Sequence, residues 1–342
     1  MASIPLKWVG PMRIHYDGVV EECQVPLATY ESPLWPSTAR GARVSMQTDE
    51  GIAVSITGDC MTRSVLLIAP SAHEAVAALH RIQAQTEAIA KAVEQTTRHG
   101  SFQSLQSEVV GHLLFLRLSM QTGDAAGHNM VTAAAEAALQ LILSQEPTLR
   151  YGSLSGNFCT DKKVSAVNGI LGRGRSAIAE IRIPVPVCRK LLRTEPEALC
   201  ELNQHKNWVG STLAGSLRSA NAHVANILLA LYLATGQDAA NIVEGSQAMT
   251  LADLDGEALR FSVTLPHLIV GTVGNGKHLP FAEENLRRLG CRNTTRRTGH
   301  NARRLAAITA AAVLCSELSL LAALTNPGEL MRTHRTLERK QA

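Results

Sequence analysis

Residues 219–237 constrain the fold more than any other stretch, because their helical pattern is apolar on nearly every side. The segment reads SANAHVANILLALYLATGQ. A helix without a polar face has to be covered by the rest of the chain, so we predict a buried central helix here. A chain of 342 residues is long enough to surround it, and at roughly 150 residues per domain it predicts two domains, or one with a large insertion.

The composition is that of a globular chain with an aliphatic core. Apolar residues make up 45%, charged residues 18% and aromatic residues 4%, which excludes disordered and low-complexity classes. So few aromatic rings argue against a surface that stacks bases or sugars. The net charge of +4 favours an anionic ligand without requiring one.

Disulfide, metal and membrane features are not expected. The seven cysteines form no C-x-x-C pair and the twelve histidines form no ligand cluster. The N-terminus lacks a long apolar run, and Ser316, Glu317 and Ser319 interrupt the most apolar later stretch, 308–325. We therefore expect a cytoplasmic protein without a signal peptide or a membrane span.

The order of helix and strand patterns indicates an inserted unit. Segments separated by Gly and Pro predict strands and loops up to about residue 64. Ser71 and Glu74 then form a capping box that starts a helix. We expect a compact insert at about residues 65–153, built from a helix at 71–98, a strand at 107–120, a helix at 130–147 and a strand near 150.

Strands and helices follow the insert and surround the apolar segment. Asn326-Pro327-Gly328 ends the last long helix and leaves a short basic tail. The patterns predict strands at 176–186, 245–255 and 259–270, and helices at 195–204, 281–290 and 301–325.

The loop Ser155–Lys163 is the most informative stretch for chemistry. It places S-G-N-F-C-T-D-K-K between two strand patterns. A lysine ammonium held by Asp161 and nearby hydroxyls could stabilise a developing oxyanion, although a solvated loop would show the same pattern. Cys159 could be a thiolate nucleophile beside a cation, or simply a small buried residue.

A glycine-rich turn, GTVGNGKH at 271–278, offers the spacing G-x-x-x-x-G-K. His278 stands where a phosphate loop has Ser or Thr, which argues against nucleotide hydrolysis. The amides of Gly271, Gly274 and Gly276 could still approach a phosphate or a nicotinamide, and a turn without a ligand is the alternative. An ordinary Rossmann half is not supported, because no G-x-G-x-x-G follows an early strand.

Three further features allow more than one interpretation. Asp238 ends a very apolar helix, where an unpaired carboxylate is costly, so we expect it to have a partner or a task. His334 follows the helix break and is by default a surface histidine. The basic run Arg287–Arg304 is either a solvated face or a surface for an acidic partner.

Five sequence blocks, given at the end of this paragraph, resemble the 3-hydroxy-3-methylglutaryl-CoA (HMG-CoA) reductase family in their order and spacing. QVPLATYE precedes them and LMRTHRTLER follows, so the resemblance runs from about Ile4 to Arg339. DAAGHNMV and the tail are similar to the class I enzymes. The blocks are TGDAAGHNM at 122–130, the loop at 155–163, NAH-x-x-N at 221–226, GQDAAN at 236–241 and SVTLPHLIVGTVGNG at 262–276.

The resemblance implies an α+β fold in which one domain interrupts another. Residues 1–64 and 154–328 would form a large HMG-CoA-binding domain around a central helix. Residues 65–153 would form an inserted small ferredoxin-like domain that binds NADP, and residues 329–342 a mobile C-terminal tail. The family also implies a homodimer or a larger even assembly, without nucleic acid or membrane partners.

In the family, the thioester of HMG-CoA is reduced to mevalonate by two hydrides from a nicotinamide cofactor, with mevaldehyde as intermediate. By position, the resemblance implies a catalytic set of Glu31, Lys162, Asp238 and His334. Lys162 would stabilise the oxyanion, and Glu31 would donate a proton from a carboxyl whose pKa is raised by burial. Asp238 would set the protonation of both, and His334 would protonate the departing CoA thiolate. The site would lie between subunits, with the Lys162 loop facing the partner's Glu31 and Asp238.

The same match implies three groups of binding residues. Arg98 suits a 2′-phosphate, so NADPH is favoured over NADH. The HMG carboxylate would contact Arg63, Ser155, Asp161 and Lys163. The CoA side would use Ser37, Arg40, Lys206, His223 and Asn226. The dinucleotide would contact Thr97, Arg98, Asp124, Gly127, Asn129, Met130, Val273 and Gly274.

Some positions depart from the family pattern. Ala39 and His128 stand where class I enzymes usually have Asn and Met, and Asn275 replaces a glycine in the cofactor turn. The chain starts just before WVGP, and we expect the family's preceding helical region to be missing, which bears on CoA affinity. Two alternative functions stay open: a reductase of a related acyl-CoA or aldehyde, and a catalytically silent relative that binds CoA or a nucleotide.

Overall fold

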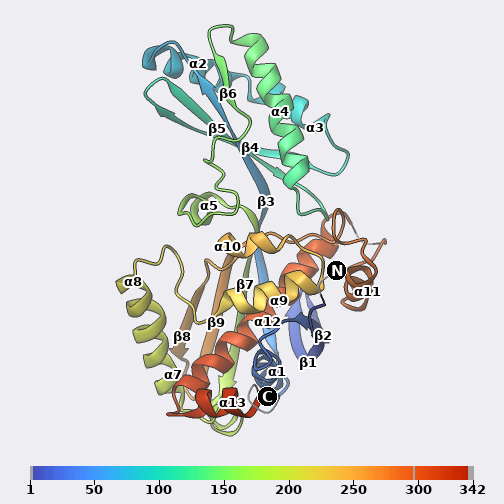
Figure 1. Cartoon of the computed structure of the whole chain (residues 1–342), viewed down its shortest axis with the longest axis vertical. Helices are drawn as coiled ribbons and strands as arrows, with labels where there is room; N and C mark the ends of the chain where they lie inside the picture. Colours follow the sequence, from blue (N-terminus) through green and yellow to red (C-terminus); the bar gives the residue numbers. More distant parts are fainter. Residues whose placement is uncertain (1–2, 296, 338–342) are drawn as a thin grey trace.

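The computed structural model describes residues 3–295 and 297–337, without the side chains at 333, 334 and 337. Helices and strands are mixed throughout, in two lobes connected by one long strand, β3 (Figure 1). The first part of β3 pairs with β7 in the larger lobe, and its second part, from Met61 onward, pairs with β5 in the smaller lobe. Because one continuous strand belongs to both lobes, their sheets are joined through the backbone.

The sheet of the larger lobe is mostly antiparallel. Its strand order is β2-β1-β3-β7-β9-β8, and among these described strands β1 and β3 are the neighbours that run parallel. The strands are β1 (Leu6–Tyr16), β2 (Val19–Ala28), β3 (Ile52–Ile68), β7 (Gly174–Pro184), β8 (Met249–Leu254) and β9 (Ala258–Leu268).

The smaller lobe has its own sheet and its own hydrophobic core. Its strands lie in the order β4-β5-β3-β6, all antiparallel to their neighbours. Apolar residues of this sheet and of three helices form a core separate from that of the larger lobe. These elements are α2 (Ala72–Ala84), α3 (Thr86–Glu94), β4 (Ser101–Val110), β5 (Leu113–Gln121), α4 (His128–Gln145) and β6 (Arg150–Ser153).

Helices complete the larger lobe, most of them short, and the site described below lies partly on them. The α-helices are α1 (Leu34–Ser45), α5 (Val167–Leu171), α6 (Val185–Val187), α7 (Pro196–Leu202), α8 (Ser211–Leu213), α9 (Val224–Ala234), α10 (Ile242–Gly245), α11 (Pro280–Arg288), α12 (His300–Leu324) and α13 (Glu329–Leu337). Two π-helical segments, η1 (Cys188–Leu192) and η2 (Asn203–Gly210), and one 3₁₀ segment, η3 (Ala239–Asn241), lie between them.

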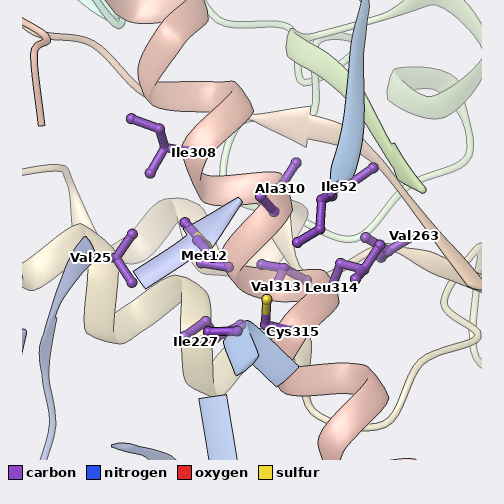
Figure 2. Close-up of a cluster of buried hydrophobic side chains, with 14 of the residues drawn as sticks. Met12, Val25, Ile52, Ile227, Val263, Ile308, Ala310, Val313, Leu314 and Cys315 are labelled. Atoms are coloured by element: carbon purple, nitrogen blue, oxygen red, sulfur yellow. The ribbon is translucent and has the colours of Figure 1, made fainter. Parts of the chain in front are cut away.

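The central helix of the larger lobe is α12, not the segment 219–237 on which we expected it. That segment forms the shorter helix α9, whereas nearly all of α12 is buried. Figure 2 shows side chains of β1, β2, β3, β9 and α9 gathered around α12. Within the described residues, α12 is also the one helix long and apolar enough to cross a membrane, but 94% of its most apolar window is buried inside the molecule. It is therefore the core helix of this lobe.

Three further expectations needed correction. Residues 34–45 form helix α1 where we expected strands and loops, because its two prolines, at 33 and 36, occupy the helix start, where no backbone donor is required. The helix predicted at 71–98 is divided at Gln85, although Ser71 accepts the Glu74 amide as predicted, at 3.1 Å. The strand predicted at 107–120 is part of the β4–β5 hairpin, which turns at Gly111.

Helix α1 packs closely on α12 through Gly41. A Cβ atom at this position would overlap the backbone carbonyl of Cys315, and neither backbone can move aside easily. We expect Gly41→Ala to lower the free energy of unfolding by about 1–3 kcal/mol, measured by urea denaturation. Gly210→Ala is the matched control, because a Cβ there meets nothing closer than 3.5 Å. Equal stabilities of the two variants would contradict this account of the α1–α12 contact.

Candidate active site

Lys162 is held in a tightly folded loop between β6 and α5. Its backbone is left-handed, with φ of 55°, as are those of Asn157 (63°) and Thr160 (42°). Such angles are unfavourable for residues other than glycine. The loop is tied to the sheet by the Gly156 amide, which donates to the Ser64 carbonyl at 2.7 Å. The backbone of this loop is therefore strained at the residue that carries the ammonium.

The ammonium of Lys162 contacts the carboxylate of Asp238 at 2.8 Å. Asp238 also caps η3 by accepting the Ala240 amide at 3.1 Å. The hydrogen bond to Asp238 raises the pKa of Lys162 against the opposing effect of burial. Burial alone would raise the pKa of Asp238, but the bonds from Lys162 and Ala240 lower it overall. Both groups are therefore charged at neutral pH, and the lysine is a fixed, protonated donor.

This pairing corrects the expectation that Lys162 would face the Asp238 of a partner subunit. Both residues belong to the same chain, since the Lys162 loop and the end of α9 meet at the junction of the two lobes. Asp238 has a partner, as expected, and that partner is Lys162. The Asp238 side chain is 46% exposed, however, so burial is not what requires the pairing.

A buried arginine, Arg173, positions the residue that precedes Lys162. Its guanidinium donates to Asp161 at 2.6 Å and to the Thr62 carbonyl at 2.6 Å, and its Nε lies 3.6 Å from Glu244. Glu244 is fully buried, which raises the pKa of its carboxyl, while Arg173 acts in the opposite direction. Arg173 does not stand out in the sequence, because its only signal is an arginine between two glycines in LGRGRS.

Lys162 and Asp238 line a cavity of about 590 Å³ together with the first turn of α4 and the glycine turn. Helix α4 begins after Gly127, whose φ is 97°, and has no acidic residue in its first turn. Its first backbone amides have no acceptor within the helix, so this end attracts anions. Five of the predicted cofactor residues meet here: Gly127, Asn129, Met130, Val273 and Gly274.

A second cavity, of about 560 Å³, adjoins the first and shares Ala125, Met130 and Val273 with it. Asp124 lines it, but its carboxylate accepts the Ala302 amide at 2.9 Å and so caps the start of α12. Thr97 and Arg98 line neither cavity, and Arg98 is exposed. The structure thus brings most of the predicted cofactor residues together, with Asp124 in a supporting role and Thr97 and Arg98 outside.

The residues predicted for the HMG carboxylate divide into two pairs. Arg63, on β3, donates to Thr132 at 2.8 Å and lies 3.5 Å from the Ser155 hydroxyl. Asp161 faces Arg173, while the exposed ammonium of Lys163 donates to the Asp161 backbone carbonyl at 3.0 Å.

A third cavity, of about 330 Å³, lies between α1, the start of α9 and the end of α12. It collects Ser37, Arg40, His223 and Asn226, four of the predicted CoA residues, and also Glu31. Asn226 donates to the Glu31 carboxylate at 2.9 Å. Lys206 does not line this cavity; its ammonium donates to Asn207 at 3.1 Å, and burial lowers its pKa.

Glu317, buried on α12, holds the start of α9 at this cavity. Its two carboxylate oxygens accept the backbone amides of Ala222 at 2.7 Å and His223 at 2.6 Å. The His223 ring nitrogen lies 3.1 Å from both Ser316 oxygens. A carboxylate at a helix N-terminus is favourable even when buried, because it satisfies free amides.

Known proteins match this chain over nearly its whole length. The family model "Hydroxymethylglutaryl-coenzyme A reductase" matches residues 1–339. The 3-hydroxy-3-methylglutaryl-coenzyme A reductase of Pyrococcus horikoshii is 42% identical over 342 residues, covering 99% of this chain and 82% of the relative. That of Methanothermobacter thermautotrophicus is 42% identical over 340 residues, covering 99% of this chain and 83% of the relative.

The chain belongs to the hydroxymethylglutaryl-coenzyme A reductase family. A solved structure of the class II HMG-CoA reductase from Streptococcus pneumoniae, bound to NADPH in open conformations, shares the fold. Its TM-score is 0.75 at 19% identity, covering 95% of this chain and 86% of that one.

The predicted catalytic residues of this HMG-CoA reductase whose side chains are described lie in two separate cavities. Lys162 and Asp238 form an ion pair in one cavity, and Glu31 lies in another, beside Asn226. In the described part of the chain, no hydrogen bond or ion pair connects Glu31 to that pair. The side chain of His334 is outside the described residues.

His128, a departure from the class I pattern, also faces the Lys162 cavity. Its Nε2 lies 3.7 Å from the Asp161 carboxylate and has no hydrogen-bond partner among the described residues. Burial lowers its pKa to about 4, with Asp161 opposing and Arg173 adding to the shift. At neutral pH the ring is uncharged, so it lines the cavity without adding a positive charge, and its Nε2 is buried on the side of Asp161.

Proposed function

We propose that this chain reduces HMG-CoA to mevalonate and CoA, with two molecules of NADPH and mevaldehyde as the intermediate. The observation that carries the proposal is the Lys162–Asp238 ion pair at 2.8 Å, which faces a cavity lined by the first turn of α4 and the glycine turn. This combination supplies a fixed cation for a developing oxyanion beside a surface of backbone donors.

The residues of the Lys162 cavity fit a nicotinamide dinucleotide. The first amides of α4 have no acceptor within the helix, no acidic residue stands in its first turn, and Gly274 and Gly276 have φ of 96° and 84°. When bound, the cofactor would supply the hydrides. The β3-α2-α3-β4-β5-α4-β6 order, with strands arranged β4-β5-β3-β6, supports a ferredoxin-like cofactor domain at 65–153.

Lys162 would hold the thioester oxygen, and later the aldehyde oxygen, through hydrogen bonds from its ammonium. Asp238 would keep that ammonium charged and pointed into the cavity. Arg63 and Ser155, which lie 3.5 Å apart, would hold the HMG carboxylate. The cavity of Ser37, Arg40, His223 and Asn226 would hold CoA, with Lys206 within reach of the charge of Glu317, and His334 on the tail would protonate the CoA thiolate.

The separation of Glu31 from Lys162 supports a homodimer whose site is completed across the subunit interface. Glu31, as proton donor, would come from the partner chain, while Lys162 and Asp238 would come from one chain. We propose a cytoplasmic location. Oxidation of NADPH by the purified protein, dependent on HMG-CoA and followed at 340 nm, tests the function. Turnover of mevaldehyde without turnover of the thioester would indicate a different substrate.

Cofactor choice gives a prediction for Arg98. Its exposed guanidinium, outside the two cavities, is free to meet a 2′-phosphate at the end of a bound dinucleotide. We expect Arg98→Met to lower kcat/KM for NADPH about tenfold and to leave kcat/KM for NADH unchanged. Lys91→Met, an exposed substitution on α3, is the control. Equal losses with the two cofactors would contradict the role assigned to Arg98.

A further inference from the structure

The role proposed for the Lys162 cavity leaves one of its charged residues unused. Lys277 follows Gly276 in the glycine turn and lines this cavity, although only 5% of its surface is exposed. Within residues 3–295 and 297–337, no carboxylate lies within 4.0 Å of its ammonium, and no side chain or carbonyl accepts a hydrogen bond from it. An ammonium that is buried and unpaired is costly, so its place in the cavity requires an explanation.

Asp238 does not neutralise Lys277. It is the charged group that favours the protonated form of Lys277, but its carboxylate is already bound to Lys162 at 2.8 Å and to the Ala240 amide. Burial dominates and lowers the pKa of Lys277. The cavity therefore contains two ammonium groups and one carboxylate, which is an excess of positive charge suited to an anionic ligand.

The backbone holds Lys277 in place. Gly276 packs against Gly236, so closely that a Cβ on either residue would overlap the carbonyl of the other. The amide of Lys277 donates to the Gly274 carbonyl at 3.2 Å, and its own carbonyl accepts from Arg292 at 2.8 Å. These contacts fix the turn against the segment that leads to Asp238, so the ammonium is presented to the cavity by a rigid support.

The other donors of the cavity indicate which anion is bound. Helix α4, of 18 residues, starts at the same cavity with no side-chain cap and no acidic residue in its first turn. Free amides at a helix start and a glycine turn suit phosphate oxygens. The pair predicted to hold the HMG carboxylate, Arg63 and Ser155, does not line this cavity, so the substrate carboxylate is not the anion that Lys277 meets.

We propose that Lys277 binds the pyrophosphate of the dinucleotide cofactor, together with the first amides of α4. The inference rests on the proposed function for the identity of the ligand, and it adds a binding residue that lies outside the catalytic pair. Because the pyrophosphate is common to NADPH and NADH, the contribution of Lys277 is independent of the 2′-phosphate. CoA also has a pyrophosphate, and the cavity of Ser37, Arg40, His223 and Asn226 is separate, so CoA affinity is independent of Lys277.

The test compares Kd values of the full chain for NADPH, NADH and CoA, each measured alone by titration calorimetry. We expect Lys277→Met to weaken NADPH and NADH equally, by about tenfold or more, and to leave CoA within about twofold. Lys277→Arg retains most of the affinity. Lys190→Met, which removes an exposed charge on η1, leaves all three constants unchanged. Removing a buried, unpaired charge also leaves the variant at least as stable as the parent, which thermal unfolding checks.

Several outcomes would overturn the proposal. Unchanged affinity for both dinucleotides in a folded Lys277→Met variant would exclude the contact. A loss for NADPH alone would assign Lys277 to the 2′-phosphate, and a loss for CoA alone would assign it to the other ligand. If the parent chain bound neither dinucleotide, the cofactor assignment itself would fail. If it bound both but turned over no HMG-CoA, the proposed function would fail while the proposal for Lys277 stood.

Discussion

Lys162→Met is expected to lower kcat about 10³-fold for HMG-CoA and by a similar factor for mevaldehyde. Both steps place negative charge on a substrate oxygen, and Lys162 is the ammonium that the structure holds ready for it, 2.8 Å from Asp238. Methionine has a similar length but no charge. The side chain of Lys162 is 37% exposed, so stability should not change. Steady-state kinetics with each substrate, at saturating NADPH, measure the effect.

The adjacent lysine provides the matched control. Lys163 is exposed and donates only to the Asp161 carbonyl, so Lys163→Met should raise KM for HMG-CoA with little change in kcat, as expected for a residue that binds the substrate carboxylate. Full activity of Lys162→Met would exclude the proposed mechanism. So would loss of the thioester step alone, because one ammonium is assigned to both oxyanions.

The pH dependence of kcat in an Asp238→Asn variant tests the same ion pair. Asp238 raises the pKa of Lys162, so the amide variant should lower that pKa. In the proposed mechanism, activity depends on the protonated lysine and is lost as pH rises through the pKa of Lys162. The alkaline limb of the kcat profile should therefore move to lower pH in the variant, and an unmoved limb would show that Asp238 does not control the charge of Lys162.

Helix and strand periodicity predicted most elements of the fold, but not which helix is central. Ser316, Glu317 and Ser319 look like interruptions of an apolar helix in the sequence. In the structure each has a partner from another part of the chain: Ser316 contacts His223, Glu317 accepts the amides at the start of α9, and Ser319 accepts from Arg40 at 3.0 Å. These polar groups are satisfied inside the core, and a single sequence does not show such pairing.

The candidate site was predictable only in part, for a related reason. The loop 155–163 and the glycine turn stand out by composition, because they gather polar residues and glycines between strands. The pairing of Lys162 with Asp238 depends on how the two lobes meet, and the resemblance alone placed it across subunits. Arg173 and Glu244 support the loop from a buried position without any local motif. The residues predicted to bind stand out in the sequence, whereas Arg173 and Glu244, which hold the loop in place, do not.

Mixing two inactive variants should restore activity if Glu31 acts across the subunit interface. Lys162→Met and Glu31→Gln each remove one member of the proposed catalytic set. The structure places Glu31 in a different cavity from Lys162, so in a hybrid dimer one of the two sites would combine an intact Lys162 with the partner's intact Glu31. Random exchange in an equal mixture should therefore recover about a quarter of the parent activity.

The same experiment with Lys162→Met and Asp238→Asn should give no activity beyond that of the Asp238→Asn chains alone. These two residues form an ion pair within one chain, so every site in a hybrid dimer of the two variants lacks one of them. Subunits are exchanged by mild denaturation and refolding, and activity is compared with that of each variant treated alone. Recovery in the second mixture would show that Asp238 comes from the partner chain. No recovery in the first mixture would show that Glu31 and Lys162 of one site come from the same subunit. The contrast between the mixtures thus determines which chain supplies each catalytic group.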